Sequence, residues 1–213
     1  MTRQRSRRGH VAASAALLAG ALLLSGCGFT AHSDSGRPAC TRDAVDVGSG
    51  QSTLDPEGVA CIVEQHRARF DLSAGPIGKA ALGVPLDEFA PEVASDDGSI
   101  DLEIVAPAGS IRVSTGHIAF AGDDVEAVVR GVTYFLVADS PEEFFGLLRA
   151  GVDDYGLDAD AVERWIDDVQ DDPDGASDFA FAPGTALGLN VSYDLRYDAA
   201  KAKQVVIVEV YPL

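Results

Sequence analysis

Residues 187–197 read LGLNVSYDLRY, a stretch in which every second side chain is large and apolar. A period of two is typical of a β-strand that has one face in a core. After a turn at 198–202, residues 204–211 (QVVIVEVY) repeat the alternation. The two segments therefore predict a β-hairpin, and the rest of the fold has to be arranged around it.

Other strand-like segments lie earlier in the chain. Short alternating stretches, separated by Pro-Ala-Gly and Thr-Gly turns, occur at 100–104, 111–113 and 118–120. They predict a run of short antiparallel strands. Residues 127–138 are longer and richer in Val, Tyr, Phe and Leu, which predicts a central strand buried on both faces.

Three segments carry helix signals. Asp55 followed by proline predicts a helix over 56–69. Ser140 and Glu143 form a capping box before an apolar face, and Asp158 precedes an apolar i, i+3, i+4, i+7 pattern. Residues 71–98 are interrupted by Gly and Pro and predict irregular or short extended pieces. Strands in groups with helices between the groups indicate an α+β fold, an antiparallel sheet with about three helices packed mainly on one face.

The N-terminal region has a different character. Four arginines precede a run at 11–24 that is apolar or small throughout, and the run ends in Leu24-Ser25-Gly26-Cys27. A run of this length matches the apolar part of a signal peptide and is too short to span a bilayer, which takes about 20 apolar residues. Polar residues follow Cys27 without a second apolar run, so we expect cleavage. An ordinary secretory signal with a cysteine by chance near the cleavage site is the alternative.

The leucine three positions before Cys27 and the small residues between them resemble the lipobox of bacterial lipoproteins, a likeness confined to residues 1–27. The resemblance implies that 1–26 is a cleaved signal peptide and that the Cys27 thiol carries acyl chains such as palmitate. Residues 27–39 would then form a flexible tether to the outer face of the cytoplasmic membrane. Each buried methylene contributes about 0.8 kcal/mol, so two or more chains anchor a protein stably where one does not. The Arg7-Arg8 pair also resembles a twin-arginine export signal, so the export route stays open.

The remaining cysteines fit an oxidising compartment. If Cys27 is acylated, Cys40 and Cys61 form an even pair, which predicts a structural disulfide. The predicted domain, 40–213, is long enough for one ordinary hydrophobic core, so we expect a single α+β ectodomain.

Charge limits the range of partners. Removal of residues 1–26 takes away four of the 16 basic residues and none of the 34 acidic ones, so the formal charge changes from −18 to about −22. A nucleic-acid partner is excluded, because the few basic residues form no basic stripe in the sequence. The acidity suits either a basic partner or simple solubility, and the preference for arginine over lysine fits a GC-rich, actinobacterial background.

No catalytic motif is present. The sequence has no Gly-x-Ser-x-Gly elbow, no phosphate-binding Gly-x-x-x-x-Gly-Lys loop, no Gly-x-Gly-x-x-Gly and no His-Glu-x-x-His pair. We therefore assign no catalytic residue and predict no cofactor. The two histidines of the domain are expected to be ordinary structural residues: His66 partly buried at the edge of a helix face, and His117 at the surface beside a strand turn.

The densest group of oxygen ligands follows the third predicted helix. Asp172, Asp174 and Asp178 are weak calcium candidates, because the ligand spacing of an EF-hand places Gln170 and Phe181 where acidic residues belong. A solvated acidic loop is the preferred prediction, and no metal is assigned.

Together these observations favour a cell-envelope lipoprotein with a non-enzymatic binding domain. Its ligand is expected to be either an apolar molecule held between sheet and helices or a protein partner close to the membrane. The alternative is an envelope or cell-wall hydrolase whose active site has no recognisable motif.

Overall fold

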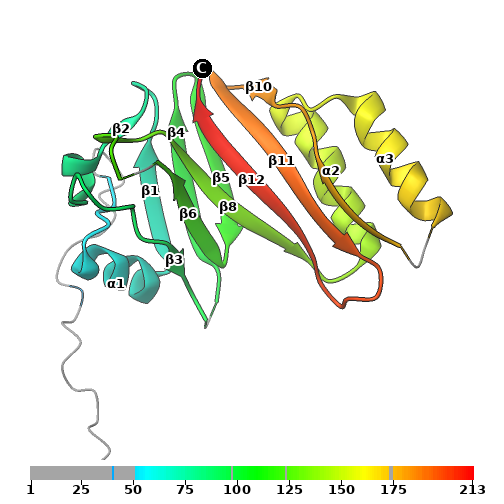
Figure 1. Ribbon diagram of the computed structural model, residues 1–213, viewed down its shortest axis with the longest axis horizontal. Helices are drawn as coiled ribbons and strands as arrows, with labels where there is room; N and C mark the ends of the chain where they lie inside the picture. The colour runs from blue at the N-terminus through cyan, green and yellow to red at the C-terminus, as the bar shows by residue number, and fades with distance from the viewer. Residues whose placement is uncertain (1–39, 41–50, 97, 123, 173–174) are drawn as a thin grey trace, which may run out of the picture. The chain divides into compact units, whose positions relative to one another are not determined.

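The computed structural model describes residues 40, 51–96, 98–122, 124–172 and 175–213, and Figure 1 shows its ribbon. The described residues belong to one compact unit, Pro38–Leu213. The predicted signal peptide, Cys27 and the tether at 27–39 lie outside the described residues. No helix within the described ranges is long and apolar enough to cross a membrane.

A large antiparallel sheet contains the predicted hairpin. Its strands follow the order β10-β11-β12-β8-β6-β3, with β9 also paired to β11. The bounds are β3 Val93–Ala94, β6 His117–Ala121, β8 Gly131–Ala138, β9 Ala176–Ala180, β10 Gly184–Ala186, β11 Leu189–Asp198 and β12 Gln204–Pro212. The hairpin prediction is confirmed: β11 and β12 pair with Tyr193 opposite Val208. The side chains of both residues are buried, as the alternation requires.

A second, three-stranded sheet has the order β1-β4-β5, with β1 Arg67–Asp71, β4 Ile100–Ala106 and β5 Gly109–Thr115. Strands β4 and β5 form the predicted antiparallel pair, whereas β1 and β4 run parallel. A small ladder joins β2 Ile77–Gly78 to β7 Val128–Val129. The two larger sheets share one hydrophobic core, in which Phe70 of β1 meets Phe120 of β6 edge to face, with ring centroids 5.1 Å apart.

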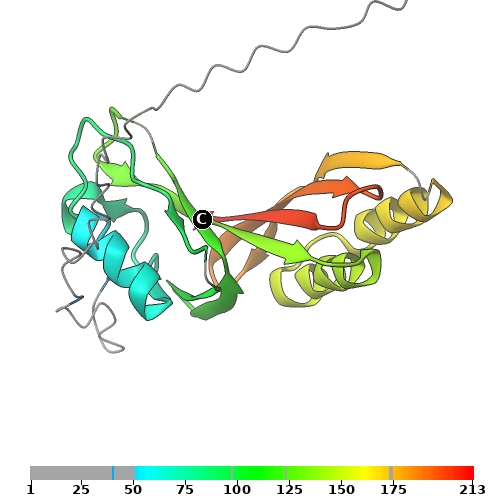
Figure 2. The same cartoon turned by 90° about the horizontal axis from the view of Figure 1, so that it is seen from below.

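The three α-helices within the described ranges begin at their predicted caps. They are α1 Pro56–Gln65, α2 Pro141–Tyr155 and α3 Ala159–Asp171, and a 3₁₀ turn, η1, spans Lys79–Leu82. At each N-terminus a side-chain oxygen accepts a hydrogen bond from the third residue along, as in Ser140 Oγ from Glu143 N at 3.1 Å. Helices α2 and α3 lie together on one face of the large sheet, and α1 packs against β1 and β3 (Figures 1 and 2). The α+β fold class is as predicted.

The prediction that the first helix runs from 56 to 69 is wrong at its C-terminus. The helix ends at Gln65, and His66 takes the left-handed conformation with φ 50°. From Arg67 onward the side chains alternate between exposed or half-buried and fully buried, which is the pattern of strand β1. Phe70 fits the apolar face of a helix and the inner face of a strand equally well, so its place in the sequence pattern did not distinguish the two.

Strand β8 is central, as predicted, but its burial is uneven. It lies between β6 and β12, and Val132 and Tyr134 are buried on the face that the helices cover. On the other face Thr133 is buried, whereas Val137 is 47% exposed. Burial on both faces therefore holds only for the first half of the strand, and residues 128–129 belong to β7 instead.

Aromatic side chains fill the space between the large sheet and its helices. Phe144 of α2 is fully buried and contacts Trp165 of α3 and Tyr197 of β11, with ring centroids 5.9 and 5.6 Å away. Phe145 extends the cluster. This packing makes the hairpin, α2 and α3 one cooperative layer.

Three tyrosines of this layer make stability sensitive to alkaline pH. Burial raises the pKa of Tyr134, Tyr155 and Tyr193 above the ordinary phenol value of about 10. Above about pH 10 the unfolded chain therefore releases these protons before the folded chain does, and stability falls as pH rises. We expect the melting temperature to drop between pH 10 and 11.5 and the drop to be smaller in Tyr134→Phe. Equal profiles for the two proteins would contradict this assignment.

Candidate functional site

The two histidines of the domain lie in separate surroundings. His117 Nε2 is 2.8 Å from Glu92 Oε2, and its ring stacks on Phe135 at a centroid distance of 4.5 Å. His66 is exposed at the end of α1, and its carbonyl accepts a hydrogen bond from Asp101 N. The expected partial burial of His66 is wrong, because the chain leaves the helix there. In the described part of the chain neither ring makes a hydrogen bond to a hydroxyl or thiol, and no contact joins the two rings.

The structure describes two of the three weak calcium candidates, and these two lie on different elements. Asp172 is the exposed C-terminal cap of α3, and Asp178 lies on β9 opposite Arg196 of β11. Asp174 lies outside the described residues. Among the residues that are described, no three His, Cys, Asp or Glu side chains form a group that could hold a metal ion.

Three arginine side chains lie on the outward face of the three-stranded sheet. In the ladder of this sheet, Arg67 stands opposite Asp101, and Arg69 stands opposite Glu103. Across the next pair, Glu103 stands opposite Arg112. Residues two apart on a strand share a face, so the side chains of one face come together from three strands. We call this set the arginine face, and it consists of Arg67, Arg69, Asp101, Glu103, Arg112 and Ser114.

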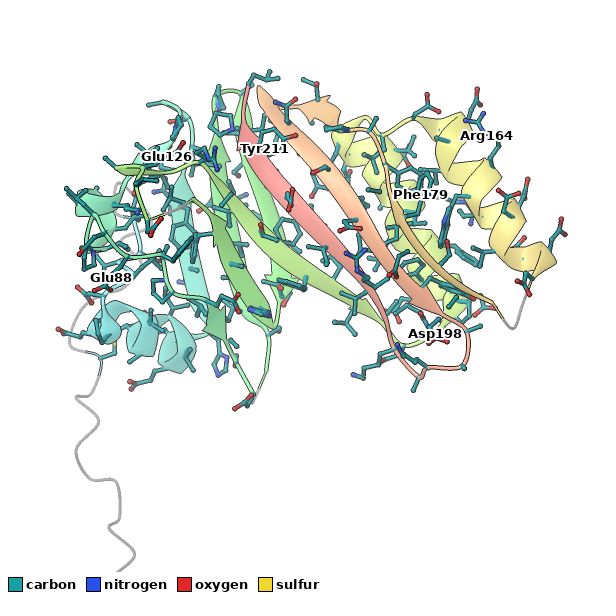
Figure 3. The ribbon with its side chains drawn as sticks, viewed as in Figure 1. Glu88, Glu126, Arg164, Phe179, Asp198 and Tyr211 are labelled. Atoms are coloured by element: carbon teal, nitrogen blue, oxygen red, sulfur yellow. A yellow bond between two sulfur atoms is a disulfide. The ribbon has the colours of Figure 1, made fainter. Side chains whose placement is uncertain are left out.

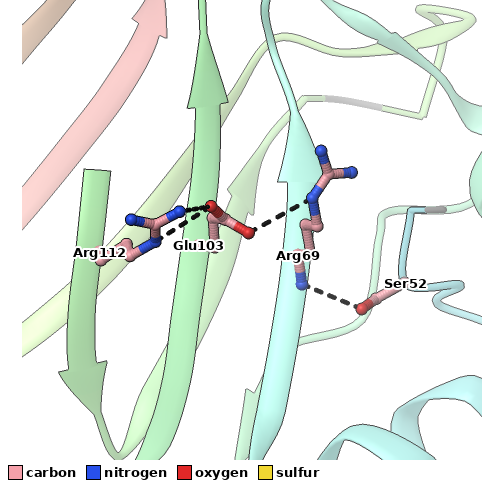
Figure 4. Close-up of polar contacts among 4 residues, drawn as sticks. All are labelled: Ser52, Arg69, Glu103 and Arg112. Carbon is pink, nitrogen blue, oxygen red and sulfur yellow. Dashed lines mark hydrogen bonds and ion pairs between the residues drawn. The ribbon is translucent and has the colours of Figure 1, made fainter. Parts of the chain in front are cut away.

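Glu103 is the centre of the arginine face (Figure 4). Arg112 Nε and Nη2 both donate to Glu103 Oε1, at 3.1 and 2.6 Å, and Arg69 Nε lies 3.4 Å from Glu103 Oε2. The backbone of Arg69 is fixed in turn, because its N–H donates to Ser52 Oγ at 3.1 Å. One carboxylate thus orients two guanidinium groups, which reduces the side-chain entropy that they lose when they bind a ligand.

The arginine face is hollow and accessible. The hollow has a volume of about 450 Å³, with Leu102 and Val113 among its lining residues. The Arg112 side chain is 76% exposed, and Arg67 is also exposed and makes no ion pair within the described ranges. The guanidinium groups of Arg67 and Arg112 therefore keep N–H donors that can reach a ligand.

The concentration of positive charge contrasts with the rest of the chain. Ten Lys and Arg residues fall within the described ranges, and three of them belong to the arginine face. Arg196, Lys201 and Lys203 at the tip of the β11–β12 hairpin form another cationic group, but each is paired with an aspartate. Asp101 and Glu103 leave the arginine face with one net positive charge, in a domain that is strongly acidic elsewhere.

Sequence reasoning missed the arginine face for an identifiable reason. The helix predicted over 56–69 contains Arg67 and Arg69, and Arg112 lies more than 40 positions later in the chain. Their convergence depends on the parallel pairing of β1 with β4, which joins strands that are distant in the sequence. The usable signal was local: Arg-Ala-Arg-Phe alternates with the period of a strand.

Comparisons with protein-family models, curated proteins and solved structures found no match to this chain.

Proposed function

We propose that this chain is a cell-envelope lipoprotein whose domain is a non-enzymatic binding module for a protein partner at the same membrane. The arginine face contacts acidic side chains of that partner. The observation that carries the proposal is the hollow lined by Arg67 and Arg112, in which Glu103 orients the donors of Arg112. Planar guanidinium groups suit bidentate binding of carboxylates, and such charge-assisted hydrogen bonds are about twice as strong as neutral ones.

The packing of the domain supports a protein partner over an apolar ligand. The space between the large sheet and α2 is occupied by the rings of Phe144, Trp165 and Tyr197. An apolar ligand at that position would have to displace side chains that are almost fully buried. A surface hollow with polar groups at its rim instead fits the polar, partly hydrated character of a protein interface.

The proposed tether keeps the binding module near its membrane. Residues 27–39 contain Gly, Ser, Asp and Pro, and a flexible coil of this length spans roughly 20 Å. That distance is about twice the Debye length at physiological salt, so the membrane charge and the domain charge are largely screened from each other. The partner is then a protein within a few tens of ångströms of the bilayer.

The anchor is tested by metabolic labelling with a clickable fatty acid. We expect the wild-type chain to carry the label and Cys27→Ala to lose it, because acylation needs the thiol. Cys40→Ser with Cys61→Ala is the matched control, since it removes two other cysteines and should keep the label. Equal labelling of wild type and Cys27→Ala would refute the anchor.

The arginine face is tested by photo-crosslinking in the native host. A photoreactive amino acid at the exposed Ser114 position should yield one discrete protein adduct. Combining it with Arg67→Gln and Arg112→Gln should lower the yield about tenfold or more, since hydrogen bonds to charged groups are worth about 1.5–3 kcal/mol each. The expected readout is the adduct band on an immunoblot of the full-length protein.

The matched control for this experiment is Arg164→Gln, which removes an exposed arginine from α3 outside the arginine face. It should leave the adduct unchanged. Adducts formed only with lipid, or a yield that does not respond to the two arginines of the hollow, would rule out the proposed contact.

A further inference from the structure

Strand β9 has one hydrogen-bonding edge that no other described strand pairs with. On either side of it, Phe181 N donates to Tyr193 O and Ala199 N donates to Gly175 O, both across the β9–β11 ladder. Inward and outward groups alternate along an antiparallel strand. The N–H and C=O groups of Ser177 and Phe179 therefore point toward β11. The N–H and C=O groups of the other three residues of β9 point away from β11.

The outward groups belong to Ala176, Asp178 and Ala180, and all three residues are exposed. In the described part of the chain no other strand pairs with this edge. An exposed edge is a template for another strand, and proteins often protect such edges with lysine, proline or a bulge. Here the outward positions hold two alanines and one aspartate, so the edge stays open to a backbone partner.

A groove lies beside the same edge. It has a volume of about 260 Å³ and is formed by α3 together with β9. Trp165, Val169 and Tyr197 supply its apolar lining, and Trp165 Nε1 donates to Ser177 Oγ at 3.1 Å. Phe179, 42% exposed, also lines the groove, and Figure 3 shows it between the backbone of β9 and α3. Helix α3 lies on the side of β9 away from β11, so a strand added to β9 would lie over this helix (Figure 1).

The charge of the groove is negative. Asp168 of α3 and its C-terminal cap, Asp172, are exposed and belong to the lining of the groove, and the last turn of the helix holds further acids. The C-terminus of a helix carries a partial negative charge as well. The end of the groove beside the C-terminus of α3 therefore attracts a cation. A second copy of this acidic domain would be repelled by that end of the groove, whereas a lysine or arginine side chain would complement it.

We propose that β9 and the groove bind an extended peptide segment of a partner protein as an additional strand. Backbone hydrogen bonds to the outward groups of β9 hold the segment, a large apolar side chain enters the groove, and a basic side chain two residues away reaches Asp168 or Asp172. Side chains two residues apart on a strand are about 7 Å apart on one face, which suits this arrangement. This site uses other residues than the arginine face. It prefers a basic ligand, whereas the arginine face prefers an acidic one.

The single tryptophan of the chain provides the readout. Because Trp165 lines the groove, a bound peptide changes its emission. The probe is the capped peptide Ser-Lys-Ser-Phe-Ser-Lys-Ser, which places Lys, Phe and Lys on one face in either strand direction. We expect a saturable shift of Trp165 emission with this peptide and at least tenfold weaker binding of Ser-Glu-Ser-Phe-Ser-Glu-Ser.

The edge is tested by a matched pair of variants at one position in the full-length protein. Asp178→Pro removes an outward N–H and should weaken binding of the lysine peptide at least tenfold, whereas Asp178→Ala keeps that N–H and should bind as wild type does. Proline is tolerated on an edge strand where the N–H faces solvent, and an unchanged melting temperature checks that the fold is kept. Asp168→Asn with Asp172→Asn should also weaken binding of the lysine peptide at least tenfold.

Three outcomes would overturn the proposal. These are the absence of a saturable shift with wild type, equal binding by the Asp178→Pro and Asp178→Ala variants in a folded protein, and equal affinity for the lysine and glutamate peptides. Loss of crosslinking at Ser114 with intact peptide binding would instead remove only the arginine-face contact, so the two proposals fail separately.

Discussion

Replacing Phe144 by alanine is expected to lower the free energy of unfolding by about 3–5 kcal/mol. Phe144 is fully buried and contacts both Trp165 and Tyr197, so its ring joins both helices of this layer to the hairpin. Removing the ring loses its transfer free energy and leaves a cavity that its rigid aromatic neighbours cannot close. The loss is a large share of the stability of an ordinary domain.

Urea unfolding followed by Trp165 emission measures this effect, because the tryptophan belongs to the same cluster. The matched control is Phe179→Ala, which removes the same ring from a position that is 42% exposed. It should cost less than about 1.5 kcal/mol, since much of its surface stays in water after folding. A cost at Phe144 no larger than that at Phe179 would show that the cluster is not the core of this layer.

The elements predicted best are those whose hydrophobic periodicity fits only one type of secondary structure. The 187–197 and 204–211 segments keep a period of two over many residues, and no helix can bury that pattern on one face. The helix caps at Asp55, Ser140 and Asp158 were predicted equally well. In each of them a side-chain oxygen accepts a hydrogen bond from the backbone N–H of the residue three positions later. Local chemistry of this kind acts within one element and needs no knowledge of the tertiary fold.

Errors occur where a segment fits both a helix and a strand and its pairing with a distant strand decides which of the two forms. Residues 67–70 satisfy a helix face and a strand face alike, and the parallel pairing with β4 selects the strand. Strand β9 was missed because its segment, Ala-Ser-Asp-Phe-Ala, is short and polar and gains its structure from β11. Both proposed binding surfaces are built on these two strands. The sequence therefore predicted the frame of the fold but neither surface, because each surface is made by pairing between distant segments.

Removal of the disulfide is expected to lower the free energy of unfolding by about 3 kcal/mol. Cys40 and Cys61 are bonded, as predicted, and the loop between them spans 21 positions. Without the bond, the unfolded chain gains the entropy of that loop, while the folded domain loses the covalent attachment of Cys40 to α1. For a domain of this size such a change corresponds to a melting temperature lower by about 6–12 °C.

The measurement compares wild type with Cys40→Ser/Cys61→Ala by thermal unfolding, with and without a reducing agent. Reduction should bring wild type down to the melting temperature of the variant and leave the variant unchanged, which separates the bond from any effect of the substitutions. Cys61 is buried, so a single change to serine would add a buried hydroxyl, and alanine avoids that cost. If the variant melts within 1 or 2 °C of wild type, the disulfide does not stabilise the fold. Its role would then be local, holding the start of the domain against α1, where Cys40 N also donates to Glu64 Oε2 at 3.2 Å.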